Sequence, residues 1–288
     1  MIGVYNIKSD LKQNLSKVFQ LCDLLKVHND FPKIDGLFVD WLPSTDNLFS
    51  HQAVIIDTYV KQGIPTIIFD RYFNLTYEHY NWLSKFSVTF LEPAICNRSG
   101  FEYFPFWTKP LDEKWYSYIK EDERPYDLIY QGELEDRVAS FEKYFLGYMK
   151  IYPKTKSLTS SKWRSLTKRL DEFRQYGEFT DESIKWQNGY FTILIGSKFD
   201  YKTGYLREDL FDILKQGCLT LLPEEHRFFS GAFQRVRVED ESYLNYFFVS
   251  HKDIRPVVIE ELYSKILETF PEMDINVATE RIRSIFTI

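Results

Sequence analysis

The sequence contains few cysteines, and their spacing suits no cysteine chemistry. Its 288 residues include 3 cysteines, Cys22, Cys96 and Cys218, which lie far apart in the chain. An odd number of scattered cysteines indicates neither a disulfide framework nor a zinc site. We therefore expect a protein of a reducing compartment, the cytoplasm.

Long apolar runs and a basic charge balance are also missing. No apolar stretch approaches the roughly 20 residues of a membrane span, and the first residues, MIGVYNIKSD, lack a signal pattern. No membrane contact is therefore expected. The formal net charge is −6, whereas general nucleic-acid binders are usually basic. Any role on DNA would need a local basic patch.

One such patch lies in the segment 150–174, which is rich in lysine and arginine. Its candidate contacts to a DNA backbone are Lys154, Lys156, Lys162 and Arg164. A solvated helix face with a preceding loop explains the same charges equally well. The sequence leaves both interpretations open.

Several enzyme classes are made improbable by motifs that the sequence does not contain. It has no Walker loop, no G-x-G-x-x-G, no H-E-x-x-H and no G-x-S-x-G. P-loop enzymes, dinucleotide dehydrogenases and serine hydrolases therefore lose most of their support. The 5 histidines show no metal-ligand spacing.

What the sequence does contain is an alternation of short apolar runs with segments of helical period. The runs PTIIFD, SVTFLEP, YDLIYQG and YFTILIG predict strands, and segments such as 9–26, 48–63, 136–149 and 205–217 predict helices. A further strand is predicted at 150–156, and helices at 257–270 and 275–286. Such alternation is typical of βαβ units with mainly parallel sheets, so the predicted class is α/β.

A charged span near residues 109–125 interrupts this alternation and predicts a domain boundary. We expect a Rossmann-like domain at 1–115, a second Rossmann-like domain at 116–270 and a C-terminal helix, 271–288, that crosses back to the first domain. The 2 domains are expected to face a central cleft.

Three residues follow predicted strands at the edge where parallel sheets bind ligands. Asp70, Gly132 and Gly196 come directly after PTIIF, YDLIYQ and YFTILI. Asp70 has three interpretations: a cap of the next helix, an ion-pair partner of Arg71, or a catalytic base.

A nucleotide site is one interpretation of the block ILIGSKFDYKTGYLREDLFDILKQG. Gly196, Ser197 and Lys198 form a loop after a strand, and the next predicted helix carries Arg207 and Asp212. A helix start and an arginine suit a diphosphate, and an acid suits ribose hydroxyls. Ordinary first-turn polar residues are the alternative.

The chain resembles the T-even phage DNA β-glucosyltransferase family. The resemblance rests on four islands in order: PTIIFDRYF, FEYFPFWTK, YDLIYQGELEDR, and ILIGSKFDYKTGYLR continuing to LTLLPEE. It spans about residues 1–250 and is sparse between the islands. The family has the GT-B fold and transfers glucose from UDP-glucose to 5-hydroxymethylcytosine in duplex DNA.

The resemblance implies a role for individual residues of this chain. Asp70 falls on the catalytic base, and Arg71, Tyr72 and Phe73 lie where the flipped base would be contacted. The implied donor-site residues are Gly132, Glu133, Arg137, Gly196, Ser197, Lys198, Arg207 and Asp212. Glu135 or Asp136 stands where the family has another arginine, and Asp212 lies two residues further from Arg207 than in the family. Asp10 is a weak match to a family acid.

The resemblance also implies a UDP-sugar donor, a divalent cation such as Mg²⁺ or Mn²⁺, and an inverting reaction. The partner would be duplex DNA with hydroxymethylated bases, in the cytoplasm of a phage-infected bacterium, and the enzyme is expected to be a monomer. The alternatives are another sugar such as arabinose, another acceptor (hydroxymethyluracil, an already glycosylated base or a molecule other than DNA), and a non-catalytic binding module.

Overall fold

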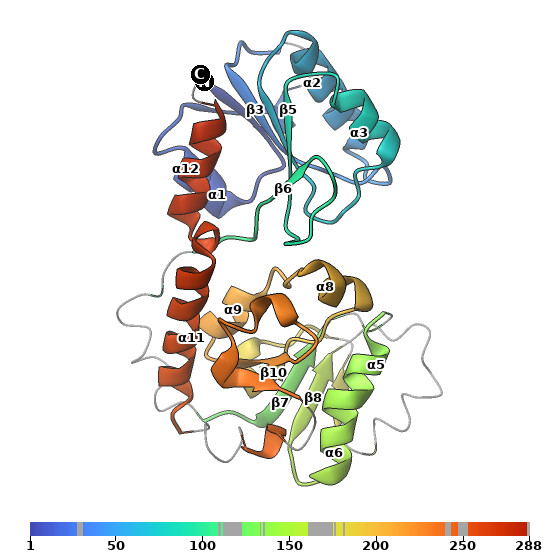
Figure 1. The fold of residues 1–288 in the computed structure, drawn as a ribbon, viewed down its shortest axis with the longest axis vertical. Helices are drawn as coiled ribbons and strands as arrows, with labels where there is room; N and C mark the ends of the chain where they lie inside the picture. The colour runs from blue at the N-terminus through green and yellow to red at the C-terminus, as the bar shows by residue number, and fades with distance from the viewer. Residues whose placement is uncertain are drawn as a thin grey trace. The chain divides into compact units, whose positions relative to one another are not determined.

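The computed structural model divides the chain into two compact units, each with its own parallel sheet (Figure 1). Unit 1 comprises Met1–Lys109 and Glu272–Ile288, and unit 2 comprises Pro110–Pro271. The predicted α/β class with mainly parallel sheets is confirmed. The structure describes residues 1–27, 31–108, 111, 123–132, 134, 136–160, 175, 177–180, 182–239, 243–246 and 253–286.

Unit 1 is built on a 6-stranded sheet with the order β2-β1-β3-β4-β5-β6, in which all neighbours are parallel. The strands are β1 (Ile2–Tyr5), β2 (Leu21–Asp23), β3 (Gly36–Asp40), β4 (Thr66–Phe69), β5 (Val88–Glu92) and β6 (Phe101–Tyr103). The helices are α1 (Ser9–Leu15), η1 (Leu24–Lys26), α2 (Phe49–Lys61), α3 (Tyr77–Leu83), η6 (Pro271–Met273) and α12 (Ile275–Phe286).

The central strands of unit 1 are apolar along their whole length because both faces of the sheet are covered. Every residue of β1, β3 and β4 is buried. A strand covered on both faces cannot alternate apolar and polar residues, which explains runs such as TIIF. α12 approaches the sheet so closely that a Cβ on Gly36 would lie 2.6 Å from the ring of Phe286.

The prediction of a single helix over 9–26 was wrong. α1 ends at Leu15, and Leu21–Asp23 instead pairs with β1 as the edge strand β2. The spacing of apolar residues in this segment suits a helix, but pairing with β1 satisfies backbone hydrogen bonds of Leu21–Asp23. Leu24, directly after this strand, is completely buried. Tertiary contacts therefore override the local pattern.

The last helix of the chain belongs to unit 1. Thr108 donates its amide hydrogen to the carbonyl oxygen of Met273, and Ile275 donates to Thr108 in return. The side-chain amide of Asn14 on α1 donates to Thr279 on α12, and Figure 1 shows the two helices side by side. The chain thus leaves unit 1, builds unit 2 and returns.

Unit 2 is built on a 6-stranded parallel sheet with the order β12-β11-β10-β7-β8-β9. Its strands are β7 (Tyr126–Gln131), β8 (Ser157–Ser160), β9 (Glu178–Thr180), β10 (Gly189–Ile193), β11 (Leu219–Pro223) and β12 (Arg237–Val238). Its helices are α5 (Val138–Phe141), η2 (Glu142–Leu146), α6 (Gly147–Ile151), η3 (Trp186–Asn188), α8 (Lys198–Thr203), α9 (Leu210–Lys215), η4 (Arg227–Phe229), η5 (Gln234–Val236) and α11 (Arg255–Thr269).

Two local predictions for unit 2 need correction. The strand expected at 150–156 lies instead at Ser157–Ser160, because α6 continues to Ile151 and a turn follows. The helix expected over 205–217 begins only at Leu210, so Arg207 precedes the helix and does not lie in its first turn. The predicted helices at 257–270 and 275–286 are confirmed as α11 and α12.

The strand order of unit 2 places a ligand-binding position between β7 and β10. Counted from β7, the strands run outward to β8 and β9 on one side and to β10, β11 and β12 on the other. The connections after β7 and β10 therefore diverge, which opens a crevice at the carboxyl ends of these strands. In unit 1 the corresponding position lies between β1 and β3.

Among the described helices, none is both long and apolar enough to cross a bilayer.

Candidate functional site

The backbone at Gly132, directly after β7, is closely approached by other groups. Its φ is +147°, which L side chains rarely adopt, and a Cβ here would lie 3.2 Å from Nη1 of Arg207. The same Cβ would lie 3.3 Å from the hydroxyl oxygen of Tyr130. Only glycine lets an arginine lie so close to the end of β7.

Arg207 is held in place by the end of β7 and by the start of α9. Its Nη2 donates to the carbonyl oxygen of Gln131 at 2.8 Å and to Asp209 at 2.5 Å, and its Nε donates to Asp209 at 3.0 Å. Its side chain is 14% exposed. The guanidinium group is therefore fixed in orientation beside Gly132 and still reaches solvent.

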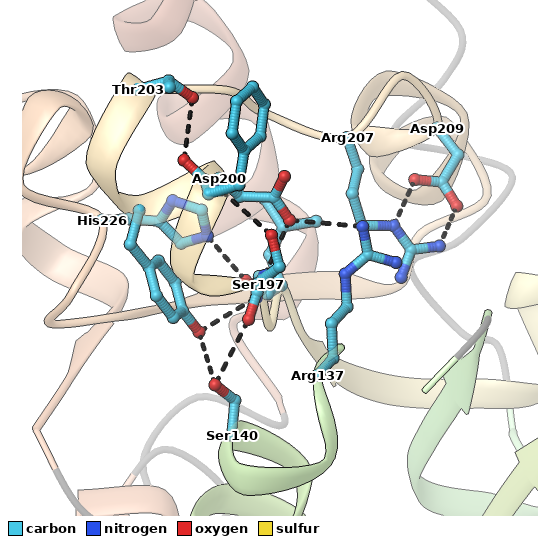
Figure 2. Close-up of polar contacts among 12 residues, drawn as sticks. Arg137, Ser140, Ser197, Asp200, Thr203, Arg207, Asp209 and His226 are labelled. Carbon is cyan, nitrogen blue, oxygen red and sulfur yellow. Dashed lines mark hydrogen bonds and ion pairs between the residues drawn. The ribbon is translucent and has the colours of Figure 1, made fainter. Parts of the chain in front are cut away.

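Arg137 approaches the same place from the start of α5, as Figure 2 shows. Its Nη2 lies 3.2 Å from Oδ2 of Asp200, and its buried Nε has no hydrogen-bond partner among the described residues. Burial lowers the pKa of Arg137, but the combined effect of Asp200, Tyr130 and Asp136 is larger, so the pKa is raised. Arg137 is thus a charged group with donor capacity left over for a ligand.

The two arginines act on the same hydroxyl group. Burial raises the pKa of Tyr130, and the charges of Arg207 and Arg137 and a hydrogen bond from Arg137 oppose that rise. The guanidinium carbon of Arg207 lies 5.9 Å from the centre of the Tyr130 ring. Gly132, Arg137 and Arg207 therefore converge at the carboxyl end of β7, where two cations would suit a diphosphate.

The loop after β10 is tied down by a capping box. Ser197 caps α8 by accepting from the amide of Asp200, and the carboxylate of Asp200 accepts from the amide of Ser197 at 2.7 Å. Since Asp200 also pairs with Arg137, the cap joins the two loops at the switch point (Figure 2). The spacing Ser-x-x-Asp was a visible signal for this cap that the sequence analysis did not use.

His226 contacts the backbone just before the same loop and was not among the predicted residues. Its Nε2 lies 3.0 Å from the carbonyl oxygen of Leu194, which can only accept, so Nε2 carries the proton. Burial lowers the pKa of His226 to about 4. The imidazole is therefore neutral at pH 7, and its fully buried position had no signal in the sequence.

Other predicted donor-site residues are not part of this cluster. Lys198 and Asp212 are exposed, and the acid that pairs with Arg207 is Asp209. Gly196 is buried, and its amide donates to the hydroxyl of Tyr201 at 2.9 Å. Glu133 lies outside the described residues.

In unit 1, Asp70 is completely buried at the carboxyl end of β4. Its Oδ1 accepts from the amide of Asn74 at 2.8 Å, and its Oδ2 accepts from the amide of Leu75 at 2.9 Å. Nη2 of Arg98 lies 2.5 Å from the same Oδ2. Thr76 is the cap of α3, so Asp70 organises the loop before this helix and does not cap it.

Arg98 joins the ends of two neighbouring strands. Besides Asp70 after β4, it binds Glu92 at the end of β5 through its Nε at 2.7 Å. Its guanidinium carbon lies 3.9 Å from the centre of the Phe101 ring. Two buried carboxylates thus share a partly exposed arginine, a contact between distant segments that the sequence analysis missed.

Arg71 forms an ion pair with Asp40 at the end of β3, not with Asp70. Its Nη2 lies 2.5 Å from Oδ2 of Asp40, and the arginine is 2% exposed. Burial raises the pKa of Asp40 to about 6, although the charge of Arg71 opposes that rise. The guanidinium group predicted to contact DNA is therefore enclosed in unit 1.

The remaining predicted acceptor-side residues differ in how accessible they are. Tyr72 is 55% exposed, whereas Phe73 is only partly exposed and has a φ of +58°. Lys154 and Lys156 are exposed in the turn between α6 and β8. Lys162 and Arg164 lie outside the described residues, so the basic patch remains a prediction.

The carboxylates at the site are engaged by arginines. Asp200 pairs with Arg137, and Asp209 pairs with Arg207. Within the part of the chain that the structure describes, no group of three His, Cys, Asp or Glu side chains could hold a metal ion. The described carboxylates of this cluster therefore do not form a protein site for a divalent cation.

Comparison with known proteins shows the fold. No family model and no curated protein sequence match the chain. An alpha-glucosyltransferase in complex with UDP-glucose and DNA containing an abasic site matches with a TM-score of 0.60 at 12% identity, over 99% of this chain and 87% of the other. WaaG, a glycosyltransferase involved in lipopolysaccharide biosynthesis, matches with a TM-score of 0.51 at 11% identity, over 100% of both chains.

These likenesses, together with the two parallel sheets, define the class of the protein. The chain has the GT-B fold, which is built from two Rossmann-like domains. At such low identity the matches establish the architecture, and the chemistry has to be argued from the residues.

We expect Gly132→Ala to weaken the binding of UDP by about 5- to 150-fold. The added Cβ would displace Arg207 and impose an unfavourable φ, which costs about 1–3 kcal/mol. Titration calorimetry with UDP measures the loss. Gly63→Ala is the matched control, because Gly63 also has a positive φ, +74°, but nothing lies within 4 Å of its Cβ position. Equal UDP affinity in wild type and Gly132→Ala would show that Gly132 takes no part in UDP binding.

We expect Asp40 to make the protein less stable as the pH rises from about 4 to 6. With its pKa raised to about 6 from the ordinary 3.8, the folded state holds a proton that the unfolded state has released. A shift of this size corresponds to about 3 kcal/mol. Urea unfolding of wild type and Asp40→Asn across this range measures it. The variant should lack this part of the slope, and parallel pH profiles would contradict the assignment.

Proposed function

We propose that the chain is a glycosyltransferase that moves a sugar from a UDP-sugar to the hydroxymethyl group of 5-hydroxymethylcytosine in duplex DNA. The observation that carries the donor half is the convergence of Arg137 and Arg207 on the hydroxyl of Tyr130, beside Gly132 at the switch point of unit 2. The acceptor half is supported by the sequence resemblance. A structural neighbour in complex with UDP-glucose and DNA containing an abasic site supports a UDP-sugar donor and a DNA acceptor.

The two arginines would act on the leaving group. As the bond between the anomeric carbon and UDP breaks, negative charge develops on the β-phosphate. Arg207 is already oriented by Gln131 and Asp209, so little reorganisation is needed when this charge appears. The guanidinium group of Arg137, which is 19% exposed, would add a second cation beside the phosphates.

Asp70 is proposed as the general base on the acceptor side. A neutral hydroxymethyl group is a poor nucleophile, so a carboxylate must take its proton as the oxygen attacks the anomeric carbon. The attack breaks the bond to UDP in the same step and inverts the configuration. Oδ1 of Asp70 accepts one hydrogen bond, from Asn74, which leaves a lone pair for the acceptor hydroxyl. Because Asp70 is completely buried, the hydroxyl would have to displace side chains that cover it, while the hydrogen bonds of the loop stay in place.

A product analysis tests the proposed reaction directly. The protein is incubated with duplexes containing 5-hydroxymethylcytosine, hydroxymethyluracil or unmodified cytosine and with a panel of nucleotide sugars, and the nucleosides are then analysed by mass spectrometry. We expect a hexose from a UDP-sugar on hydroxymethylcytosine. The NMR spectrum of the product should show an anomeric configuration opposite to that of the donor. A pentose or a product on hydroxymethyluracil would favour the alternative sugar or acceptor, and no product at all would favour the binding module.

Replacing either arginine should weaken donor binding. A charge-assisted hydrogen bond contributes about 1.5–3 kcal/mol, so Arg137→Ala and Arg207→Ala are each expected to raise the Kd for UDP by about 10- to 150-fold. Arg235→Ala is the control, since Arg235 is an arginine of unit 2 that is 49% exposed and pairs with Glu261. Unchanged UDP affinity in both variants would refute the donor site.

Asp70→Asn separates a base from a structural acid. The amide keeps one acceptor oxygen for the loop but cannot take a proton, so kcat should fall by about 10²- to 10⁴-fold while UDP binding persists. Asp57→Asn, at an acid on α2 that pairs with Lys61, serves as the control. A variant with a lowered melting temperature but a wild-type kcat would show that Asp70 only holds the loop.

A further inference from the structure

The loop from Asp70 to Leu75 is locked at both ends. The carboxylate of Asp70 accepts from the amides of Asn74 and Leu75, and Nη1 of Arg98 donates to the carbonyl oxygen of Leu75 at 3.2 Å. Leu75 is 4% exposed and anchors the loop in the core. These contacts leave the middle of the loop little freedom to change its conformation.

The locked loop holds a bulky residue in an unfavourable conformation. Phe73 has a φ of +58°, in the left-handed region that bulky residues rarely adopt. Such a conformation persists only when the surrounding contacts dictate it, and strained residues of this kind cluster at active sites and ligand-binding segments. The exposed residue next to Phe73 is Tyr72.

The ring of Tyr72 covers a buried cation. The guanidinium carbon of Arg71 lies 5.5 Å from the centres of the Phe69 and Trp107 rings and 5.7 Å from that of Phe106. It lies 6.0 Å from the centre of the Tyr72 ring. Asp40 fixes the same arginine. One side of Tyr72 therefore lies against a buried cation that Asp40 holds, while the residue is 55% exposed.

We propose that Tyr72 is a preorganised platform on which a base of the acceptor DNA stacks. The proposal rests on the proposed function in taking DNA as the acceptor, and it assigns to Tyr72 the contact that Arg71 is too deeply buried to make. An exposed ring that is already oriented loses little side-chain freedom on binding, which favours affinity. Stacking on an aromatic ring tolerates any base, because every base has a flat face.

Binding of the full chain to two labelled duplexes, without nucleotide sugar, tests this role. The duplexes are identical except that one carries an unpaired 5-hydroxymethylcytosine where the other carries an abasic site. Wild type should bind the duplex with the base more tightly. Tyr72→Ala should lose about 10- to 100-fold in affinity for that duplex and bind the abasic duplex unchanged, while Tyr72→Phe should retain the preference.

Tyr77→Ala is the matched control, because Tyr77 is 78% exposed at the start of α3 and lies outside the locked loop. Three outcomes overturn the proposal: wild-type affinity of Tyr72→Ala for the base, an equal loss on both duplexes, or no preference in wild type. A sugar-transfer assay on the same proteins keeps the two claims apart. If Tyr72 contributes to base-dependent binding but no sugar is transferred, only the proposed reaction is contradicted. If sugar is transferred and Tyr72→Ala binds both duplexes as wild type does, only the proposed platform is contradicted.

Discussion

The parallel pairing of β7 with β10 is the constraint on which the donor side of this protein depends. The two strands are separated by most of the first half of unit 2, yet their register places Gly189 beside Tyr126 and Phe191 beside Leu128. Their carboxyl ends, and the loops with Gly132 and Gly196, therefore lie at one edge of the sheet. Because the chain leaves these strands in opposite directions, the edge stays open for a ligand. Arg137, Arg207 and the capping box gather at this opening.

In unit 1, the carboxyl ends of the strands carry buried charged side chains. Asp40, Asp70 and Glu92 follow or end adjacent strands and are almost fully buried. A buried carboxylate is tolerated only with a partner, and Arg71 and Arg98 supply the partners. One consequence is a rigid loop after β4 with an exposed tyrosine. Another consequence is that the positive charges of Arg71 and Arg98 lie close to Asp70, in addition to the apolar side chains that bury it.

The alternation of apolar runs and helical segments predicted the fold class because fully buried parallel strands leave a strong pattern. TIIF, GYFTI and LTLLP are buried along their whole length. The same reasoning failed at Leu21–Asp23, where an edge strand of three residues gains its stability from β1 and leaves a pattern that also fits a helix. It failed at Arg207 too, because the contacts with Gln131 and Asp209 hold the segment before α9 out of the helix.

The sequence by itself determined which residues stand at the ends of strands: Asp70, Gly132 and Gly196 follow apolar runs, and strand ends in parallel sheets meet at one edge. Only the tertiary structure decided which side chains meet there. Arg71 pairs with Asp40 and not with its neighbour Asp70, and Arg207 binds both Asp209 and the carbonyl oxygen of Gln131. The physical reason is that spacing along the chain determines the direction of side chains only within one helix or strand. An ion pair between loops depends on strand register and burial, and these are determined by the whole domain.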